Sequence, residues 1–119
     1  MEQEQAILAL AALAQPTRLE TFRLLVQHAP GGLPAGDIAR ALVVPQNTMS
    51  AHLNILSRAG LVSSQRHSRI IMYRAEIEQL RDMTLFLLQD CCGGSAELCG
   101  PLIAELTPCC IPNTQESPV

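Results

Sequence analysis

The sequence has few aromatic residues and no long apolar stretch. Its 119 residues include no tryptophan, one tyrosine and two phenylalanines, and the longest apolar run covers only residues 6–14. A membrane-spanning helix needs about 20 such residues. The opening residues, MEQEQ, carry two acids and no base, unlike a secretory leader. We therefore expect a cytoplasmic protein with one small domain, which dimerisation would enlarge economically.

Acidic residues are absent from one long part of the chain. Residues 38–75 contain five arginines and no Asp or Glu, whereas the other three arginines share the rest of the chain with all eleven acids. The net charge of −3 therefore conceals a strongly basic segment. This segregation predicts a surface suited to a polyanion such as DNA, the alternative being a basic face that is merely solvated.

Apolar spacing and prolines predict four helices in the first half of the chain. Residues 7–13 form the first, and Pro16 suits the opening turn of a second helix that Pro30 ends. Residues 37–42 and 45–58 follow as two helices with a short break between them. Two helices joined by a tight turn form a helix-turn-helix.

The second helix of this motif has one apolar and one polar side. Met49, Leu53 and Leu56 share a stripe, which predicts a buried face. The other side carries short hydrogen-bonding side chains, namely Gln46, Asn47, Thr48, Ser50 and Asn54, with His52 nearby. Such side chains can reach phosphates and base edges from a helix in a major groove, although an ordinary solvated face has the same composition.

Two β-prone runs follow, LVSSQR and IIMYRA, on either side of Arg66-His67-Ser68-Arg69. They predict a hairpin with a basic tip, which after a helix-turn-helix is the wing of a winged helix. The expected fold class is thus mainly α with a small β-hairpin. Arg66 and Arg69 are expected to lie along the phosphate backbone or to enter a minor groove.

A last helix is predicted over residues 77–92. Its apolar coverage is wider than one stripe, so we expect part of it, with the first helix, to form a homodimer interface. We divide the chain into a DNA-binding and dimerisation domain, residues 1–90, and a cysteine-containing loop and tail, residues 91–119. The sequence has no phosphate loop and no nucleophile paired with a base, so we do not expect an enzyme.

All five cysteines lie in that last segment, at Cys91, Cys92, Cys99, Cys109 and Cys110. In a reducing cytosol, an odd number of thiols indicates metal binding or redox sensing rather than a framework of structural disulfides. The thiols are therefore candidates for chemistry.

The segments PTRLETFRLL, PQNTMSAHLNILSRAGLV and RHSRIIMYRA, in this order, resemble the ArsR/SmtB family of metal-responsive repressors over residues 5–90. The resemblance implies a homodimeric winged-helix repressor that binds operator DNA and is released by an inducer. It also implies DNA contacts from two groups of residues, Gln46, Asn47, Thr48, Ser50 and His52 on the recognition helix and Arg66 and Arg69 on the wing.

Two inducer sites of that family lack their ligands here. The stretch ALVVPQNTMS has no cysteine pair, and the last helix has no histidine for zinc. CCGGSAELC resembles the C-terminal three-cysteine arsenite site of one branch, which implies that Cys91, Cys92 and Cys99 bind As(III) or Sb(III). These ions are thiophilic and favour three thiolates, whereas zinc normally recruits four ligands.

Several alternatives remain for these thiols. They could be small buried hydrophobic residues, a redox or persulfide switch that links Cys91 or Cys92 to Cys99, or ligands for cadmium or lead. Cys109 and Cys110 are either passive tail residues or a second site for a metalloid with two free coordination positions, such as a methylated arsenical.

Overall fold

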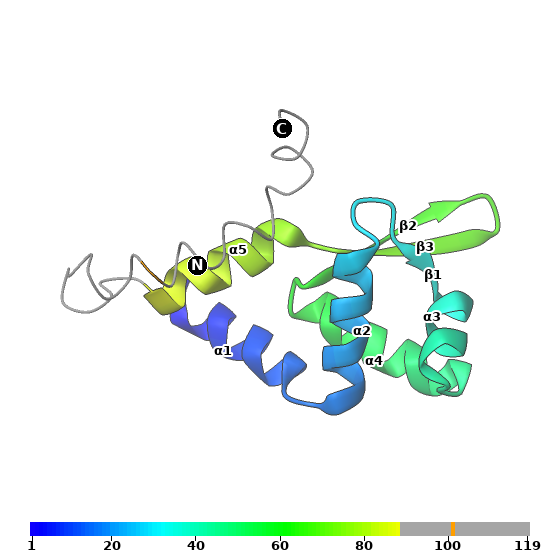
Figure 1. Cartoon of the computed structure of the whole chain (residues 1–119), viewed down its shortest axis with the longest axis horizontal. Helices are drawn as coiled ribbons and strands as arrows, with labels where there is room; N and C mark the ends of the chain where they lie inside the picture. Colours follow the sequence, from blue (N-terminus) through cyan, green and yellow to red (C-terminus); the bar gives the residue numbers. More distant parts are fainter. Residues whose placement is uncertain (89–100, 102–119) are drawn as a thin grey trace. The chain divides into compact units, whose positions relative to one another are not determined.

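The computed structural model of the protein describes residues 1–88 and residue 101. In this part the winged helix-turn-helix is confirmed, with five helices and one small sheet (Figure 1). The elements in chain order are α1 (Gln3–Leu13), α2 (Pro16–Gln27), β1 (Leu33–Pro34), α3 (Ala35–Leu42), α4 (Gln46–Arg58), β2 (Val62–His67), β3 (Ile70–Ala75) and α5 (Ile77–Leu88).

The step from α1 to α2 is held by local hydrogen bonds. Pro16 occupies the first position of α2, where a missing amide donor costs nothing, and the Gln15 side chain accepts a hydrogen bond from the Arg18 amide at 2.9 Å. The Arg18 side chain in turn donates from Nε to the Ala12 carbonyl at 2.6 Å. Arg18 therefore ties α2 to the end of α1.

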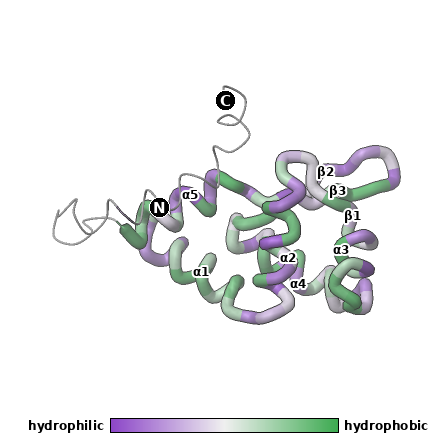
Figure 2. Tube along the Cα trace, viewed as in Figure 1, coloured by the Kyte–Doolittle hydropathy of each residue, from purple (hydrophilic) through white to green (hydrophobic). Residues whose placement is uncertain are grey.

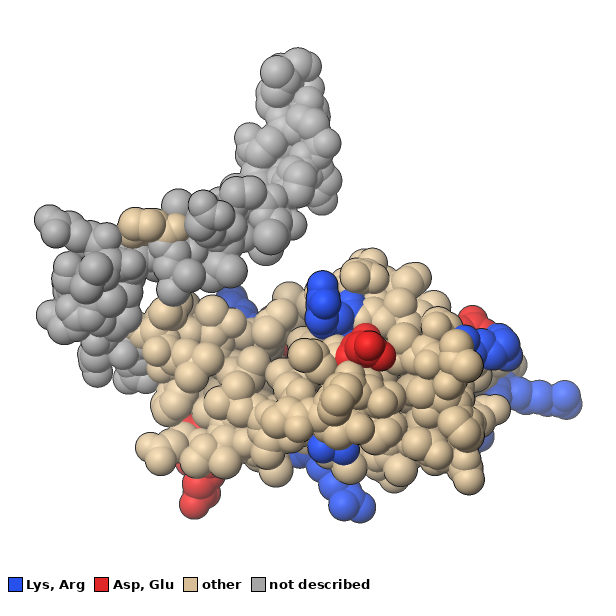
Figure 3. Space-filling model, turned by 60° about the horizontal axis from the view of Figure 1, so that its bottom comes forward, with Lys and Arg blue, Asp and Glu red and all other residues tan. Residues whose placement is uncertain are grey.

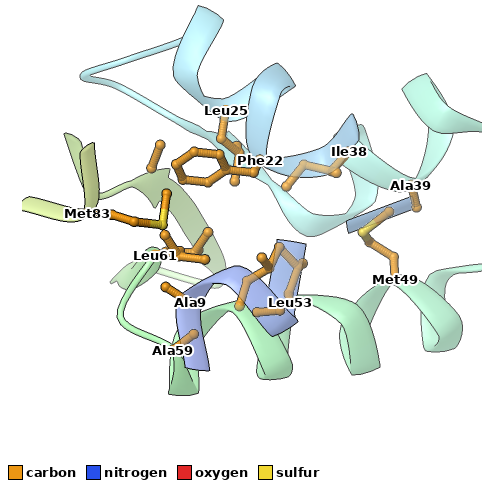
Figure 4. Packing of buried hydrophobic residues seen from close by; sticks show 14 residues of the cluster. Ala9, Phe22, Leu25, Ile38, Ala39, Met49, Leu53, Ala59, Leu61 and Met83 are labelled. Carbon is orange, nitrogen blue, oxygen red and sulfur yellow. The ribbon is translucent and has the colours of Figure 1, made fainter. Parts of the chain in front are cut away.

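One hydrophobic core joins the helices to the sheet. In Figure 4, Phe22 of α2, Leu61 after α4 and Met83 of α5 point toward one another. The buried side of α1 consists only of alanines, Ala6, Ala9 and Ala12, which lets its backbone approach the core closely. The largest fully buried hydrophobic side chains are Leu25, Ile38, Met49, Leu53, Leu56 and Leu61.

The predicted stripe on α4 is confirmed. Met49, Leu53 and Leu56 are each at most 1% exposed, so they fix which side of the recognition helix faces outward. Thr21 of α2 is the one buried polar side chain among the described residues; its hydroxyl donates to the Thr17 carbonyl at 2.8 Å and contacts the Met49 sulfur at 3.6 Å. Its own helix therefore satisfies this hydroxyl in the core.

The sheet has one strand that the sequence did not predict. The hairpin of β2 and β3 was expected, but β1 adds a third strand, in the order β1-β3-β2, with Leu33 opposite Tyr73. Two residues are too few to show the alternation that marks a strand. Immediately before β1, Gly32 has a φ of +84°, and a Cβ at this position would overlap the Tyr73 carbonyl. The next helix, α3, starts at Ala35, two residues before the predicted start.

Met1–Phe86 form one compact unit, and Leu87–Val119 form a second. The extension of the last helix to residue 92, and the domain boundary after residue 90, lie outside the described residues. No helix in the described part of the chain is long and apolar enough to cross a membrane.

Candidate nucleic-acid interface

The recognition helix α4 presents its predicted polar side to solvent. Gln46, Asn47, Thr48 and Ser50 are all exposed, opposite the buried stripe. Pro45 precedes the helix and has no side-chain hydrogen-bonding group that could cap it. The Asn47 side-chain oxygen instead accepts a hydrogen bond from the Thr48 amide at 2.8 Å, within the first turn. The start of α4 is therefore the polar, open end of the helix.

His52 differs from these four residues. It is half-buried, and its Nδ1 atom is buried without a hydrogen-bond partner in the described structure. Burial lowers the pKa of His52, and the nearby charge of Arg18 lowers it further. Only part of the imidazole is therefore accessible from outside. Its expected DNA contact remains a prediction.

The hairpin forms with the basic residues near its tip, as predicted. Arg66 lies in β2 opposite Ile71, and Arg69 belongs to the two-residue turn after His67. Ser68, the other residue of this turn, adopts a φ of 63°, a conformation that glycine takes more readily. Residues 64–71 are all exposed, so the two arginines are free to reach a ligand. Figure 2 shows the β2 side of the tip as the more hydrophilic one.

The wing and the turn between α3 and α4 lie at the same end of the Met1–Phe86 unit (Figure 1). Arginine side chains project from this end in the space-filling view (Figure 3). Arg40 on α3 forms an exposed ion pair with Asp37, the last acid before the acid-free segment. Since this pair is exposed, water screens it and leaves Arg40 available to a stronger anion.

A hollow of about 580 Å³ lies where α3 meets α4. It is lined by Gly36, Ala39, Arg40, Val43, Val44, Pro45 and Gln46. Arg40 belongs to the basic segment of the sequence, whereas Val43 carries no sequence signal for nucleic acid. The hollow adds an apolar and a cationic group beside Gln46, one of the predicted DNA contacts.

The predicted inducer ligands are all thiols from the last segment of the sequence. Cys91, Cys92, Cys99, Cys109 and Cys110 all lie outside the described residues. Among the residues that are described, no three His, Cys, Asp or Glu side chains group together as metal ligands.

Comparison with known proteins agrees with this architecture. Residues 13–65 match a family model described as a helix-turn-helix domain. The transcriptional repressor SdpR of Bacillus subtilis is 34% identical over 77 residues, which are 65% of this chain and 82% of SdpR.

Two solved structures extend the likeness. The homodimeric winged helix-turn-helix domain of Mb0332 from Mycobacterium bovis, a possible ArsR-family regulator, is 30% identical with a TM-score of 0.61, covering 71% of this chain and 77% of that one. A possible transcriptional regulator for arsenical resistance is 28% identical with a TM-score of 0.56, covering 82% and 94%. With its recognition helix, wing and matching relatives, the chain belongs to the ArsR/SmtB family of winged helix-turn-helix transcriptional regulators.

Proposed function

We propose that this protein is a metalloid-responsive repressor that binds operator DNA as a homodimer and dissociates when As(III) or Sb(III) binds Cys91, Cys92 and Cys99. The observation that carries the DNA-binding half is the exposed polar start of α4 beside the arginines of the wing. The thiol cluster in the sequence carries the inducer half.

DNA binding follows from the chemistry of these two elements. The start of α4 enters a major groove, where Gln46, Asn47 and Ser50 reach base edges. Arg66 and Arg69 neutralise backbone phosphates and set the register without reading sequence. A two-fold operator then presents its half-sites about one helical turn apart.

A homodimer accounts for the apolar residues that the single chain leaves in solvent. Ile7 and Leu8 on α1 are 56% and 52% exposed, and Leu85 and Leu87 on α5 are 57% and 58% exposed. Such large apolar groups are stabilised when a second copy covers them. Mb0332, which is similar in fold, is a homodimer.

The inducer half rests on thiol chemistry and on position in the chain. Cys91 and Cys92 lie three and four residues after the end of α5, and α5 carries part of the proposed dimer interface. Metalloid binding there alters the spacing of the two recognition helices. To empty a nearly full operator, the metalloid must bind the free protein more tightly than the DNA-bound protein by about 5.5 kcal/mol. DNA must then weaken the affinity for the metalloid to the same extent.

The test is fluorescence anisotropy of a duplex selected in vitro from a random library, with arsenite titrated into the complex. The native protein is expected to release DNA, whereas Cys91→Ser, Cys92→Ser and Cys99→Ser stay bound at the same arsenite concentration. The double variant Cys109→Ser/Cys110→Ser is the matched control from the tail. If all three single variants release DNA like the native protein, the assigned thiols are wrong.

The same assay separates the redox alternative. An oxidant or persulfide without arsenite should leave the complex intact under this proposal. Release by oxidant that dithiothreitol reverses, together with no response to arsenite, would assign the thiols to redox sensing. Release by cadmium or lead in place of arsenite would assign them to a divalent soft ion.

A further inference from the structure

Val43, in the turn between α3 and α4, has an unusual backbone conformation. It adopts a φ of 55° and a ψ of 53°, the left-handed region. The turn closes the end of α3, with the Val44 amide bonded to the Ala39 carbonyl at 2.9 Å and the Val43 amide to the Arg40 carbonyl at 3.3 Å. This position is usually glycine or asparagine, and a β-branched residue is an outlier there.

Packing among the described residues does little to offset this strain. The Val43 side chain is 89% exposed, more than any other large hydrophobic side chain of the described residues. Its two methyl groups therefore contribute almost nothing to the core. A residue that is both strained and exposed is a candidate for a role in binding, because strain of this kind concentrates at ligand sites.

The surroundings of Val43 indicate what it binds. Val43 lines the hollow together with the Arg40 guanidinium and the Gln46 side chain. Both of these groups extend over Gly36, where an added Cβ would lie 3.6 Å from Arg40 Nη1 and 3.9 Å from Gln46 Nε2. An apolar group therefore stands beside a cation and a carboxamide at the start of the recognition helix.

We propose that Val43 is a specificity-determining residue that packs against the C5 methyl group of a thymine, while Arg40 binds a nearby phosphate. Apolar contact with this methyl is an established way to read thymine in the major groove. The inference rests on the proposed binding of operator DNA. Duplex DNA suits the hollow better than a protein surface because the segment from Ile38 to Ala75 has no acid and five arginines.

Replacing each thymine of the selected duplex by deoxyuridine tests this contact, because the exchange removes only the methyl group. For the native protein, the exchange of at least one thymine per half-site should lower the affinity on the order of 4-fold. This is the value expected when one buried carbon is removed. Val43→Ala, Val43→Gly and Val43→Asn should bind the thymine and uracil duplexes equally at that position. Leu19→Ala, which shortens an exposed apolar side chain on α2, away from α4 and the wing, is the control that keeps the native response.

Thermal unfolding separates the contact from the strain. Val43→Gly and Val43→Asn should raise Tm because both residues tolerate the left-handed region, whereas Val43→Ala should not. Native protein that binds DNA but responds to no thymine exchange overturns the inference and leaves the proposed function standing. The inference is also overturned, with the proposed function left standing, if Val43→Gly loses as much affinity as the native protein when thymine is exchanged for deoxyuridine. Native protein that binds no duplex contradicts the proposed function and this inference together.

Discussion

Individual residues in this chain carry constraints that the identity of the amino acid alone does not reveal. Gly31 and Gly32 are neighbours in one turn, yet only Gly32 has a positive φ and faces the Tyr73 backbone. Val43 has a positive φ without being glycine, and His52 is polar but partly enclosed. In each case the backbone or the surroundings determine the role.

Gly32→Ala should destabilise the protein by more than about 1 kcal/mol, because alanine is strained at this φ and its Cβ overlaps the Tyr73 carbonyl. The measurement is urea unfolding followed by circular dichroism. Gly31→Ala is the matched control, since its Cβ would meet only the His28 carbonyl at an ordinary 3.9 Å. Equal losses for both variants would show that the close approach to β3 has no energetic weight.

His52 predicts a dependence of stability on pH. Its pKa is lowered in the folded protein by burial and by Arg18, so the unfolded chain binds more protons just below pH 6.5. The free energy of unfolding should therefore fall as the pH drops from 7.5 to 5.5.

Replacing His52 by asparagine removes the titrating group and should flatten this part of the stability curve, measured as Tm at pH 5.5 and 7.5. His67→Asn, on the exposed wing, is the control variant that also replaces one histidine by asparagine. A curve that is equally steep in native protein and His52→Asn would assign the dependence to other groups.

At the scale of elements, the proposed function assigns different roles to the helix-turn-helix and the wing. The exposed hydrogen-bonding side chains at the start of α4 are proposed to read bases, and the guanidinium groups of the hairpin tip are proposed to hold phosphates. The end of α4 is also joined to α5, because Gln79 Nε2 donates to the Ala59 carbonyl at 3.1 Å and the Glu76 amide to the Leu61 carbonyl at 2.8 Å. One side-chain and one backbone hydrogen bond therefore link the start of α5 to the end of the recognition helix.

Arg66→Ala and Arg69→Ala should each weaken binding on all duplexes alike and lower the slope of log affinity against log salt by about 1. Asn47→Ala and Ser50→Ala should instead change the preference among duplexes. Arg23→Ala, an exposed change on α2, serves as the control. Anisotropy titrations at several salt concentrations measure both effects, and identical behaviour of the two groups would contradict the division of roles.

For the whole molecule, the exposed apolar residues of α1 and α5 predict that two copies of the chain associate as a dimer. Ile7→Glu and Leu85→Glu should shift the protein toward monomer in sedimentation velocity, because a buried carboxylate without a partner is costly. The affinity for DNA should fall as the dimer is lost, since each subunit contacts only one half-site. Ile70→Gln, on the wing, should leave the dimer intact. A monomeric native protein would overturn this prediction.

The sequence by itself determined the helices, the hairpin and the basic segment, because apolar periodicity, prolines and charge are local properties of the chain. It also predicted the polar face of α4, since Met49, Leu53 and Leu56 fix the opposite side. Only the tertiary structure revealed β1, the partly enclosed His52 and the strained, exposed Val43. β1 depends on a partner far away in sequence, as Leu33 pairs with Tyr73, and no local pattern encodes such a pairing. The conformation of Val43 is set by the turn that closes α3, and neither its strain nor its exposure can be read from a valine in the sequence.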